Sequence, residues 1–135
     1  MPLNVELLES SFQAVAPKAT GLADLFYETL FREHPEVRSL FPESMDVQKK
    51  KLVASLSTIV ASLRKPEKLE SFLHEIGERH VAYGATEAHY PVVGATLLKC
   101  LAQIAGPAWT PELEETWATA YSVISETMLS AAKEG

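Results

Sequence analysis

Proline residues divide this 135-residue chain into segments that each have the length and periodicity of a helix. Most of the eight prolines stand beside stretches in which apolar residues recur every three or four positions. Proline lacks a backbone N–H and cannot continue a helix, whereas it fits at a helix start or just after an end. No stretch shows the strict alternation of apolar and polar residues that is typical of a strand. The pattern therefore predicts an all-α protein.

The expected helices follow from these boundaries. A first amphipathic helix is expected after Asn4, a suitable N-cap with Glu6 in the first turn, and it ends at Pro17. The next helices are expected over about 18–34, 35–41 and 47–63, with Asp46 as the cap of the third. The remaining helices are expected from Pro66 to a loop over 83–87, from Pro91 at the first helical position to about Ala105, and from Pro111 onward.

Composition limits the class of protein. A hydrophobic share of 47%, a charged share of 22% and a length of 135 residues are typical of one globular domain. The net charge of −6 argues against nucleic acid and anionic membrane surfaces as partners. The single cysteine, Cys100, and an N-terminus without a basic and apolar leader favour a cytoplasmic location. The most apolar stretch, Val92–Ala105, is expected to be too short to span a bilayer.

Motifs that carry chemistry are few. The chain has no phosphate-binding or dinucleotide-binding glycine motif, and its four histidines form no Glu-x-x-His or His-Glu-x-x-His pair. His80 is distinctive because it continues the apolar helix face of Leu73 and Ile76. One interpretation is a core histidine that is bonded to a carbonyl group. The other is the one side-chain ligand of an iron ion that a porphyrin holds.

Two more polar residues occur on apolar helix faces. Tyr27 follows Phe26 in the middle of an apolar segment, and Gln48 precedes Leu52 by four residues and shares its inward face. A buried phenol or amide without a hydrogen-bond partner costs about 1–3 kcal/mol. Each residue alone fits a satisfied core group or a boundary position. Together with His80, they are consistent with a ligand-binding site.

Short motifs in a fixed order along the chain resemble those of bacterial single-domain globins and of the globin domain of flavohaemoglobins. The motifs are Phe26-Tyr27, Leu30-Phe31, Pro35, Leu40-Phe41, Gln48 with Lys51-Leu52, His80, Tyr90-Pro91-Val92-Val93-Gly94 and Trp117-x-x-x-Tyr121. The resemblance extends over essentially the whole chain. It implies a single globin domain over residues 1–135, with helices A, B, C, E, F, G and H around a haem pocket.

The resemblance also implies haem b as the cofactor and a role for each pocket residue. His80 would be the proximal ligand, which binds the iron through Nε2, and Tyr27 and Gln48 would be distal hydrogen-bond donors. The other implied contacts are Leu52 over the haem, Phe41 against the porphyrin, Lys51 facing a propionate, and Tyr83, Tyr90 and Val93 around the cofactor. Tyr90 matches the tyrosine that supports the proximal histidine in flavohaemoglobins. The supporting glutamate of that family falls near Ala132, so peroxidase-like chemistry lacks one of its residues here.

The distal residues suggest a function. A dioxygen ligand carries partial negative charge, so hydrogen-bond donors in a low-dielectric pocket favour it over carbon monoxide. The first expectation is therefore reversible dioxygen binding for storage or delivery, with slow release. The alternative is a nitric oxide dioxygenase, or related detoxification of nitric oxide, sulfide or peroxide, which takes electrons from a separate reductase because the chain has no flavin reductase domain. A haem-based sensor and a helical interaction module without haem are further alternatives.

The remaining candidate residues have simpler interpretations. His89 is interpreted as a surface or capping residue and is the second choice for the proximal ligand. His34 is expected at a helix end and His74 in solvent or in an ion pair. The run Lys49–Lys51 is either a solvated face or a docking patch for an acidic reductase. Cys100, Trp109 and Trp117 are expected to be packing residues.

Overall fold

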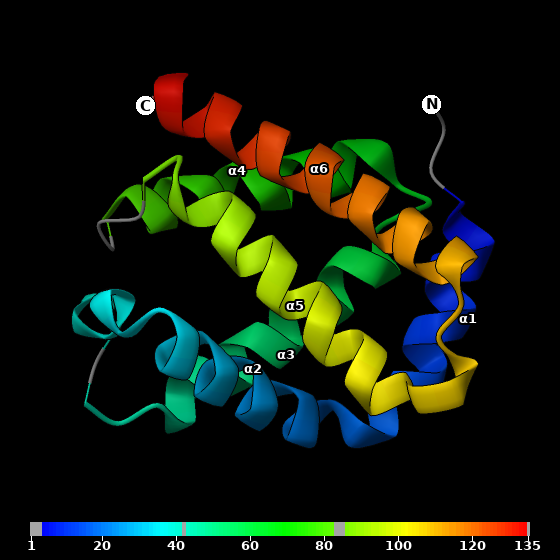
Figure 1. The fold of residues 1–135 in the computed structure, drawn as a ribbon. Coiled ribbons are helices and arrows are strands. Elements are labelled where there is room, and N and C mark those ends of the chain that lie inside the picture. Colours follow the sequence, from blue (N-terminus) through cyan, green and yellow to red (C-terminus); the bar gives the residue numbers. More distant parts are fainter. Residues whose placement is uncertain (1–3, 42, 83–85, 135) are drawn as a thin grey trace.

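The computed structural model describes residues 4–41, 43–82 and 86–134. Within these residues it contains six α-helices and three 3₁₀-helices and no strand (Figure 1). The predicted all-α class is therefore confirmed. The α-helices are α1 (Val5–Val15), α2 (Ala19–Glu33), α3 (Asp46–Ala61), α4 (Pro66–Ala82), α5 (His89–Ala105) and α6 (Pro111–Glu134). The 3₁₀-helices are η1 (Ala16–Lys18), η2 (Pro35–Leu40) and η3 (Gly106–Ala108).

Two groups of helices lie on either side of α5. Helix α4 packs along α6, and α2 packs against both α3 and α5, so that α5 crosses between the two groups (Figure 1). The larger buried cluster contains residues of α1, α2, α5 and α6, including Leu8, Leu30 and Leu101. A smaller cluster consists of Leu73, Ile76, Tyr90 and Met128. Tyr27 belongs to the larger cluster and Tyr90 to the smaller one, so the predicted site residues are divided between the two.

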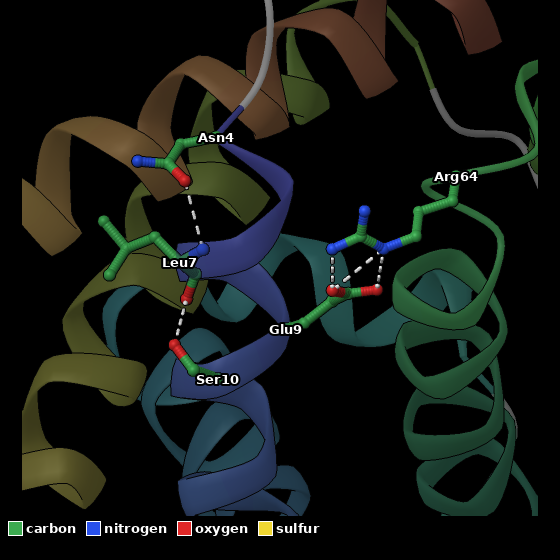
Figure 2. A network of polar contacts seen from close by, with 5 residues as sticks. All are labelled: Asn4, Leu7, Glu9, Ser10 and Arg64. Carbon is green, nitrogen blue, oxygen red and sulfur yellow. Dashed lines mark hydrogen bonds and ion pairs between the residues drawn. The ribbon is translucent and has the colours of Figure 1, made fainter.

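Helix α1 is fixed at its start and against the rest of the fold. The Asn4 side-chain oxygen accepts a hydrogen bond from the Leu7 backbone N–H at 3.1 Å, which confirms the predicted N-cap (Figure 2). Glu9 forms an ion pair of 2.8 Å with Arg64, which follows α3 (Figure 2). The hydrogen bond from Arg64 lowers the pKa of the Glu9 carboxyl group. This contact joins the end of α3 to α1.

Helices α4 and α6 approach closely at Gly77. A Cβ atom at this position would lie 2.5 Å from the main-chain oxygen of Met128, closer than side-chain carbons approach in proteins. Only glycine permits this separation between the two helices. Because Gly77 precedes His80 by less than one helical turn, the contact also fixes the distance of the His80 backbone from α6.

Two helix starts differ from the prediction. Met45, and not Asp46, is the N-cap of α3 and makes no side-chain capping bond. Asp46 is instead the first helical residue, where its negative charge complements the positive end of the helix. Helix α5 begins at His89, so Pro91 is its third residue. The first four N–H groups of a helix have no intrahelical acceptor, and proline therefore fits at the third position as well as the first.

Other helix boundaries in the structure also differ from the predicted ones by one or two residues. The segment around Pro17 forms η1, and α2 therefore begins at Ala19 rather than Lys18 and ends at Glu33. Helix α3 ends at Ala61, two residues earlier than expected, although Leu63 is still buried in the larger cluster. These differences leave the apolar faces of both helices as predicted.

The apolar helical run of α5 and η3 extends from His89 to Ala108. Its 20 residues are long and apolar enough, by length and composition, to cross a membrane. The expectation of a stretch too short to span a bilayer concerned 92–105 alone, and the helical run in the structure is longer. In the structure, the run packs against α2 and α6 and contributes Leu97, Cys100 and Leu101 to the larger cluster.

Candidate functional site

His80 lies on α4, one turn after the buried Ile76, and its side chain is half-buried. Its Nδ1 atom is 2.8 Å from the Ile76 carbonyl oxygen. A carbonyl oxygen can only accept, so Nδ1 carries the proton and donates it. In that tautomer the lone pair is on Nε2, which is the atom that binds a metal ion. The carbonyl contact of the first interpretation and the ligand of the second are therefore compatible.

Tyr90 lies beside His80 at the start of α5. The Tyr90 ring is buried, and its centroid is 6.2 Å from the centroid of the His80 imidazole. Burial raises the pKa of the Tyr90 phenol above its ordinary value, so the phenol is neutral at physiological pH. The structure thus brings Tyr90 and His80 together, as the resemblance implied.

Tyr121 of α6 fixes the position of Tyr90. The Tyr121 hydroxyl donates a hydrogen bond of 2.7 Å to the main-chain oxygen of Tyr90. The Tyr121 ring crosses α5 at Gly94, where an added Cβ atom would lie 2.4 Å from the ring. Gly94 is therefore required for this crossing. Tyr121 belongs to one of the sequence motifs, but no role was predicted for it. Its position one helical turn after Trp117 was the signal that could have placed it on the same helix face.

Tyr27 and Gln48 form a pair on the other side of the site, at α2 and α3. The Gln48 side-chain N–H donates to the Tyr27 hydroxyl oxygen at 3.4 Å. Tyr27 is buried, and Gln48 is half-buried. Burial raises the pKa of the Tyr27 phenol, and the hydrogen bond from Gln48 offsets part of that increase. In the described part of the chain, no group accepts a hydrogen bond from the Tyr27 hydroxyl itself, so its proton is available to a ligand.

Aromatic rings surround Tyr27. The Phe41 ring lies 5.6 Å from the Tyr27 ring and 5.3 Å from the Phe31 ring, with edge-to-face geometry in both pairs. The Phe26 ring contacts Tyr27 at 4.9 Å. Phe31 was not among the predicted site residues, yet it lies one helical turn after Tyr27 and was detectable from that spacing. These rings hold the phenol in an apolar surrounding where a hydrogen bond is strong.

The remaining predicted residues occupy different surroundings. Leu52 lies one turn after Gln48 on α3, and Leu52 and Val93 are both half-buried against the larger cluster. Lys51 is exposed, and the structure gives no contact that tests its role beside a propionate. Tyr83 lies outside the described residues. Ala132, the position of the expected supporting glutamate, lies in α6.

The residues at this site fit a haem. In the described residues, no group of three or more His, Cys, Asp or Glu side chains is placed to hold a metal ion. A haem needs only one imidazole from the protein, and the His80 tautomer supplies the required lone pair. None of the side chains of α3 is fully buried, although Leu52, Leu56 and Ile59 are half-buried on one face. That face leaves apolar surface for a flat, largely apolar group to cover.

The other histidines and the lysine run have structural contacts. His89 Nδ1 accepts a hydrogen bond of 2.9 Å from the backbone N–H of Thr86, which precedes α5, whereas the N-cap of α5 is Ala88 and makes no side-chain capping bond. His34 is the C-cap of α2, and His74 pairs with Glu70 at 3.8 Å. Lys49 forms an ion pair of 3.0 Å with Asp24, whereas Lys50 and Lys51 are exposed. Cys100 is buried, as expected.

Comparison with known proteins identifies the family and the fold of the chain. The sequence profile of the family described as Globin matches residues 24–128. A flavohemoprotein of Bacillus subtilis is 26% identical over 96% of this chain and 33% of its own length. An engineered carbene transferase from Rhodothermus marinus, provisionally assigned as a nitric oxide dioxygenase, has 25% identity and a TM-score of 0.87, covering 96% of this chain and 91% of that one. A bacterial globin from Campylobacter jejuni has 24% identity and a TM-score of 0.85, covering 96% of this chain and 94% of that one.

The chain spans about one third of the length of the flavohemoproteins that it matches. Those proteins are named for a flavin and a haem, and the region shared with this chain has the length of one globin domain. The structural neighbours have the same helical fold over nearly the whole of both chains. The predicted fold class and family are therefore confirmed.

Proposed function

This chain belongs to the globin family, and we propose that it binds haem b and uses it to bind dioxygen reversibly. The observation that carries the proposal is the Tyr27 hydroxyl, which is buried among aromatic rings, accepts from Gln48 and keeps its own proton. A ligand with partial negative charge would accept that proton. Carbon monoxide gains much less from the same donor because it carries little charge.

The proximal side of the proposal rests on His80. Its Nδ1 proton is held by the Ile76 carbonyl oxygen, so the ring has a fixed tautomer and Nε2 is the ligand atom. Tyr90 packs beside the imidazole and limits its rotation about the side-chain bonds. Leu52, Val93 and Phe41 supply apolar contacts to the ring system of the cofactor. Lys51 is assigned to a propionate because its side chain is exposed next to that face of α3.

The cofactor supplies an iron ion that binds diatomic gases reversibly. The chain supplies selectivity, exclusion of water and a donor of fixed geometry. Gln48 orients the Tyr27 hydroxyl oxygen, which leaves the hydroxyl proton to turn toward the ligand. Phe31 and Phe41 keep solvent away from the hydroxyl, so the hydrogen bond forms in a low-dielectric region. Release of dioxygen is therefore expected to be slow.

Absorption spectroscopy tests this function. The purified chain is expected to show a Soret band that scales with its iron content, and a pyridine haemochrome of the b type. Ferrous protein mixed with air is expected to form a stable oxygenated spectrum that reverses when oxygen is removed. A purified protein that contains no haem and binds none when haem is added would support a helical interaction module instead.

A second function, nitric oxide dioxygenation, is favoured by the relatives. Sequence relatives such as the one from Bacillus subtilis are flavohemoproteins, and one structural neighbour carries a provisional assignment as a nitric oxide dioxygenase. For this chain the electrons would come from a reductase on another polypeptide or another part of a longer one. Mixing the oxygenated protein with nitric oxide tests a single turnover. Steady consumption of nitric oxide with a flavin reductase and its nicotinamide donor is needed to establish an enzyme.

A further inference from the structure

A second cavity lies away from the candidate haem site, where α1 meets the end of α5, η3 and the start of α6. It is partly enclosed and has a volume of about 170 Å³. Its inner wall contains Val15, Leu101 and Leu113, which are all buried. Both tryptophans of the chain, Trp109 and Trp117, border it. None of the residues that line it belongs to the candidate haem site.

The indole N–H of Trp109 is buried and makes no hydrogen bond with any described residue. A buried donor without an acceptor costs about 1–3 kcal/mol. No other buried side-chain nitrogen or oxygen in the described residues lacks a partner. Because the indole N–H makes no hydrogen bond now, a turn of the ring toward a new acceptor breaks none. Trp109 lines the cavity, so a turn of its indole ring would present this N–H to an occupant that carries an acceptor.

The other polar groups at the cavity already have partners. The Trp117 indole N–H donates to the Ser11 hydroxyl oxygen at 3.0 Å, and that hydroxyl donates to the Leu7 carbonyl oxygen at 2.7 Å. The Ser10 hydroxyl donates a hydrogen bond of 3.3 Å to the same carbonyl oxygen, within helix α1 (Figure 2). These contacts leave the Trp109 N–H as the one buried side-chain donor among the lining residues that still needs an acceptor.

We propose that this cavity is a binding site for a small, largely apolar molecule of about the size of a substituted benzene that carries one hydrogen-bond acceptor. Apolar cavities of about 150 Å³ bind benzene-sized molecules in proteins. The aliphatic and aromatic walls supply the binding surface, and the Trp109 N–H selects for the acceptor. The proposal is independent of the function of the haem site, because the two sites share no residue.

Acetophenone and ethylbenzene are a suitable pair of probes, since they have nearly the same shape and only acetophenone has an acceptor. The haem-loaded protein is kept in its ferrous carbon monoxide form, which is diamagnetic and has an occupied distal position. The two indole N–H signals are followed by nitrogen–proton NMR, with Trp109→Phe used to assign them. Saturable binding of both probes is expected. Acetophenone is expected to move the Trp109 indole proton downfield, with an unchanged Soret band.

Two variants distinguish the contribution of the hydrogen bond to binding from the contribution of the apolar cavity. In Trp109→Phe, with Trp117 as the reporter, acetophenone affinity is expected to fall about threefold to tenfold relative to any change in ethylbenzene affinity, which corresponds to one hydrogen bond. The change in ethylbenzene affinity measures the effect of the smaller phenylalanine ring on binding, because ethylbenzene makes no hydrogen bond. Ala14→Leu, at an exposed lining position, is expected to fill the cavity and abolish binding of both probes.

Three results would overturn the proposal. The first is the absence of any saturable shift of either indole signal at millimolar probe concentrations. The second is an equal loss of affinity for both probes in Trp109→Phe, which would show that the indole N–H does not select for an acceptor. The third is a Soret shift that follows the same binding curve, which would place the probes at the haem. A downfield Trp109 signal that Ala14→Leu abolishes would establish the site.

Discussion

The Tyr121 hydroxyl of α6 donates a hydrogen bond of 2.7 Å to the main-chain oxygen of Tyr90, in the first turn of α5. The Tyr90 ring lies against the His80 imidazole with 6.2 Å between centroids. A residue of the last helix therefore fixes the segment that packs beside the proposed haem ligand. The contact joins residues 31 positions apart, which local sequence patterns do not reveal.

Removal of the Tyr121 hydroxyl is expected to destabilise the fold. Tyr121→Phe keeps the ring against Gly94 but removes the hydrogen bond to the Tyr90 carbonyl oxygen, which contributes about 1 kcal/mol. For a chain of this size the melting temperature should fall by about 3–5 °C. Thermal unfolding of the haem-free protein measures this change without a contribution from haem binding. A variant as stable as the wild type would show that the bond contributes nothing.

Addition of a methyl group at Gly94 is expected to cost more. In Gly94→Ala the new Cβ would lie 2.4 Å from the Tyr121 ring, so α5 and α6 must separate or the ring must leave its position. A loss of about 1–3 kcal/mol in the free energy of unfolding is expected. Urea denaturation at constant pH measures this loss.

Gly21→Ala is the matched control for this substitution. Gly21 is exposed near the start of α2, and an added Cβ would meet no atom within 4 Å. Alanine has a higher helix propensity than glycine, so this variant should be stabilised by up to about 1 kcal/mol. If both variants changed the free energy of unfolding in the same direction, the close approach of Tyr121 to Gly94 would be wrong.

Helix positions and apolar faces were predictable from the sequence because proline and periodicity act locally. The N-cap of α3 and the first residue of α5 were not, since the choice between Met45 and Asp46 as the cap, or between His89 and Pro91 as the first residue, depends on a shift of one or two residues. The grouping of Tyr27 and Gln48 in one site was suggested by two polar residues on apolar faces, whereas the hydrogen bond between them was not predicted. The crossing of Tyr121 over Gly94 was not, because it depends on how two distant helices pack.

The distal hydrogen bonds are expected to control release of dioxygen. Tyr27→Phe should increase the dioxygen dissociation rate about tenfold to a hundredfold, as expected for loss of a hydrogen bond to a charged acceptor. Carbon monoxide dissociation should change by less than about threefold, because the ligand gains little from a donor. Stopped-flow replacement of dioxygen by carbon monoxide measures the first rate.

The contribution of Gln48 is tested by a double-mutant cycle. Gln48→Leu alone should also increase dioxygen release, because the Tyr27 hydroxyl loses the N–H that orients it. The combined Tyr27→Phe and Gln48→Leu variant should release dioxygen more slowly than the product of the two separate effects predicts. Strictly multiplicative effects would mean that the two side chains act independently.

The buried tyrosines predict a loss of stability at high pH. Burial raises the pKa of the Tyr27, Tyr90 and Tyr121 phenols in the folded state. Below pH of about 10, the unfolded value, these phenols are neutral in both states and their contribution to stability is complete. Above it the unfolded chain ionises first, so stability falls as the pH rises toward the folded pKa values.

Urea denaturation at pH 8, 10 and 11 measures this dependence. The midpoint should decrease mainly between pH 10 and 11, and the decrease should be smaller in Tyr121→Phe because that variant lacks one of the shifted phenols. Lysine ion pairs also weaken in this range, and they are the same in both proteins. An identical decrease in the two proteins would show that Tyr121 ionises equally easily in the folded and unfolded states.

The identity of the iron ligand is the central claim, and the deoxy ferrous spectrum of His80→Gly with and without added imidazole tests it most directly. We predict that the variant loses the spectrum of five-coordinate histidine-ligated haem and that free imidazole restores it by occupying the space of the missing ring. His89→Gly, the control, should keep the wild-type spectrum because the His89 Nδ1 atom already accepts a hydrogen bond from the Thr86 backbone N–H. A His80→Gly protein with the wild-type spectrum in the absence of imidazole would contradict the assignment.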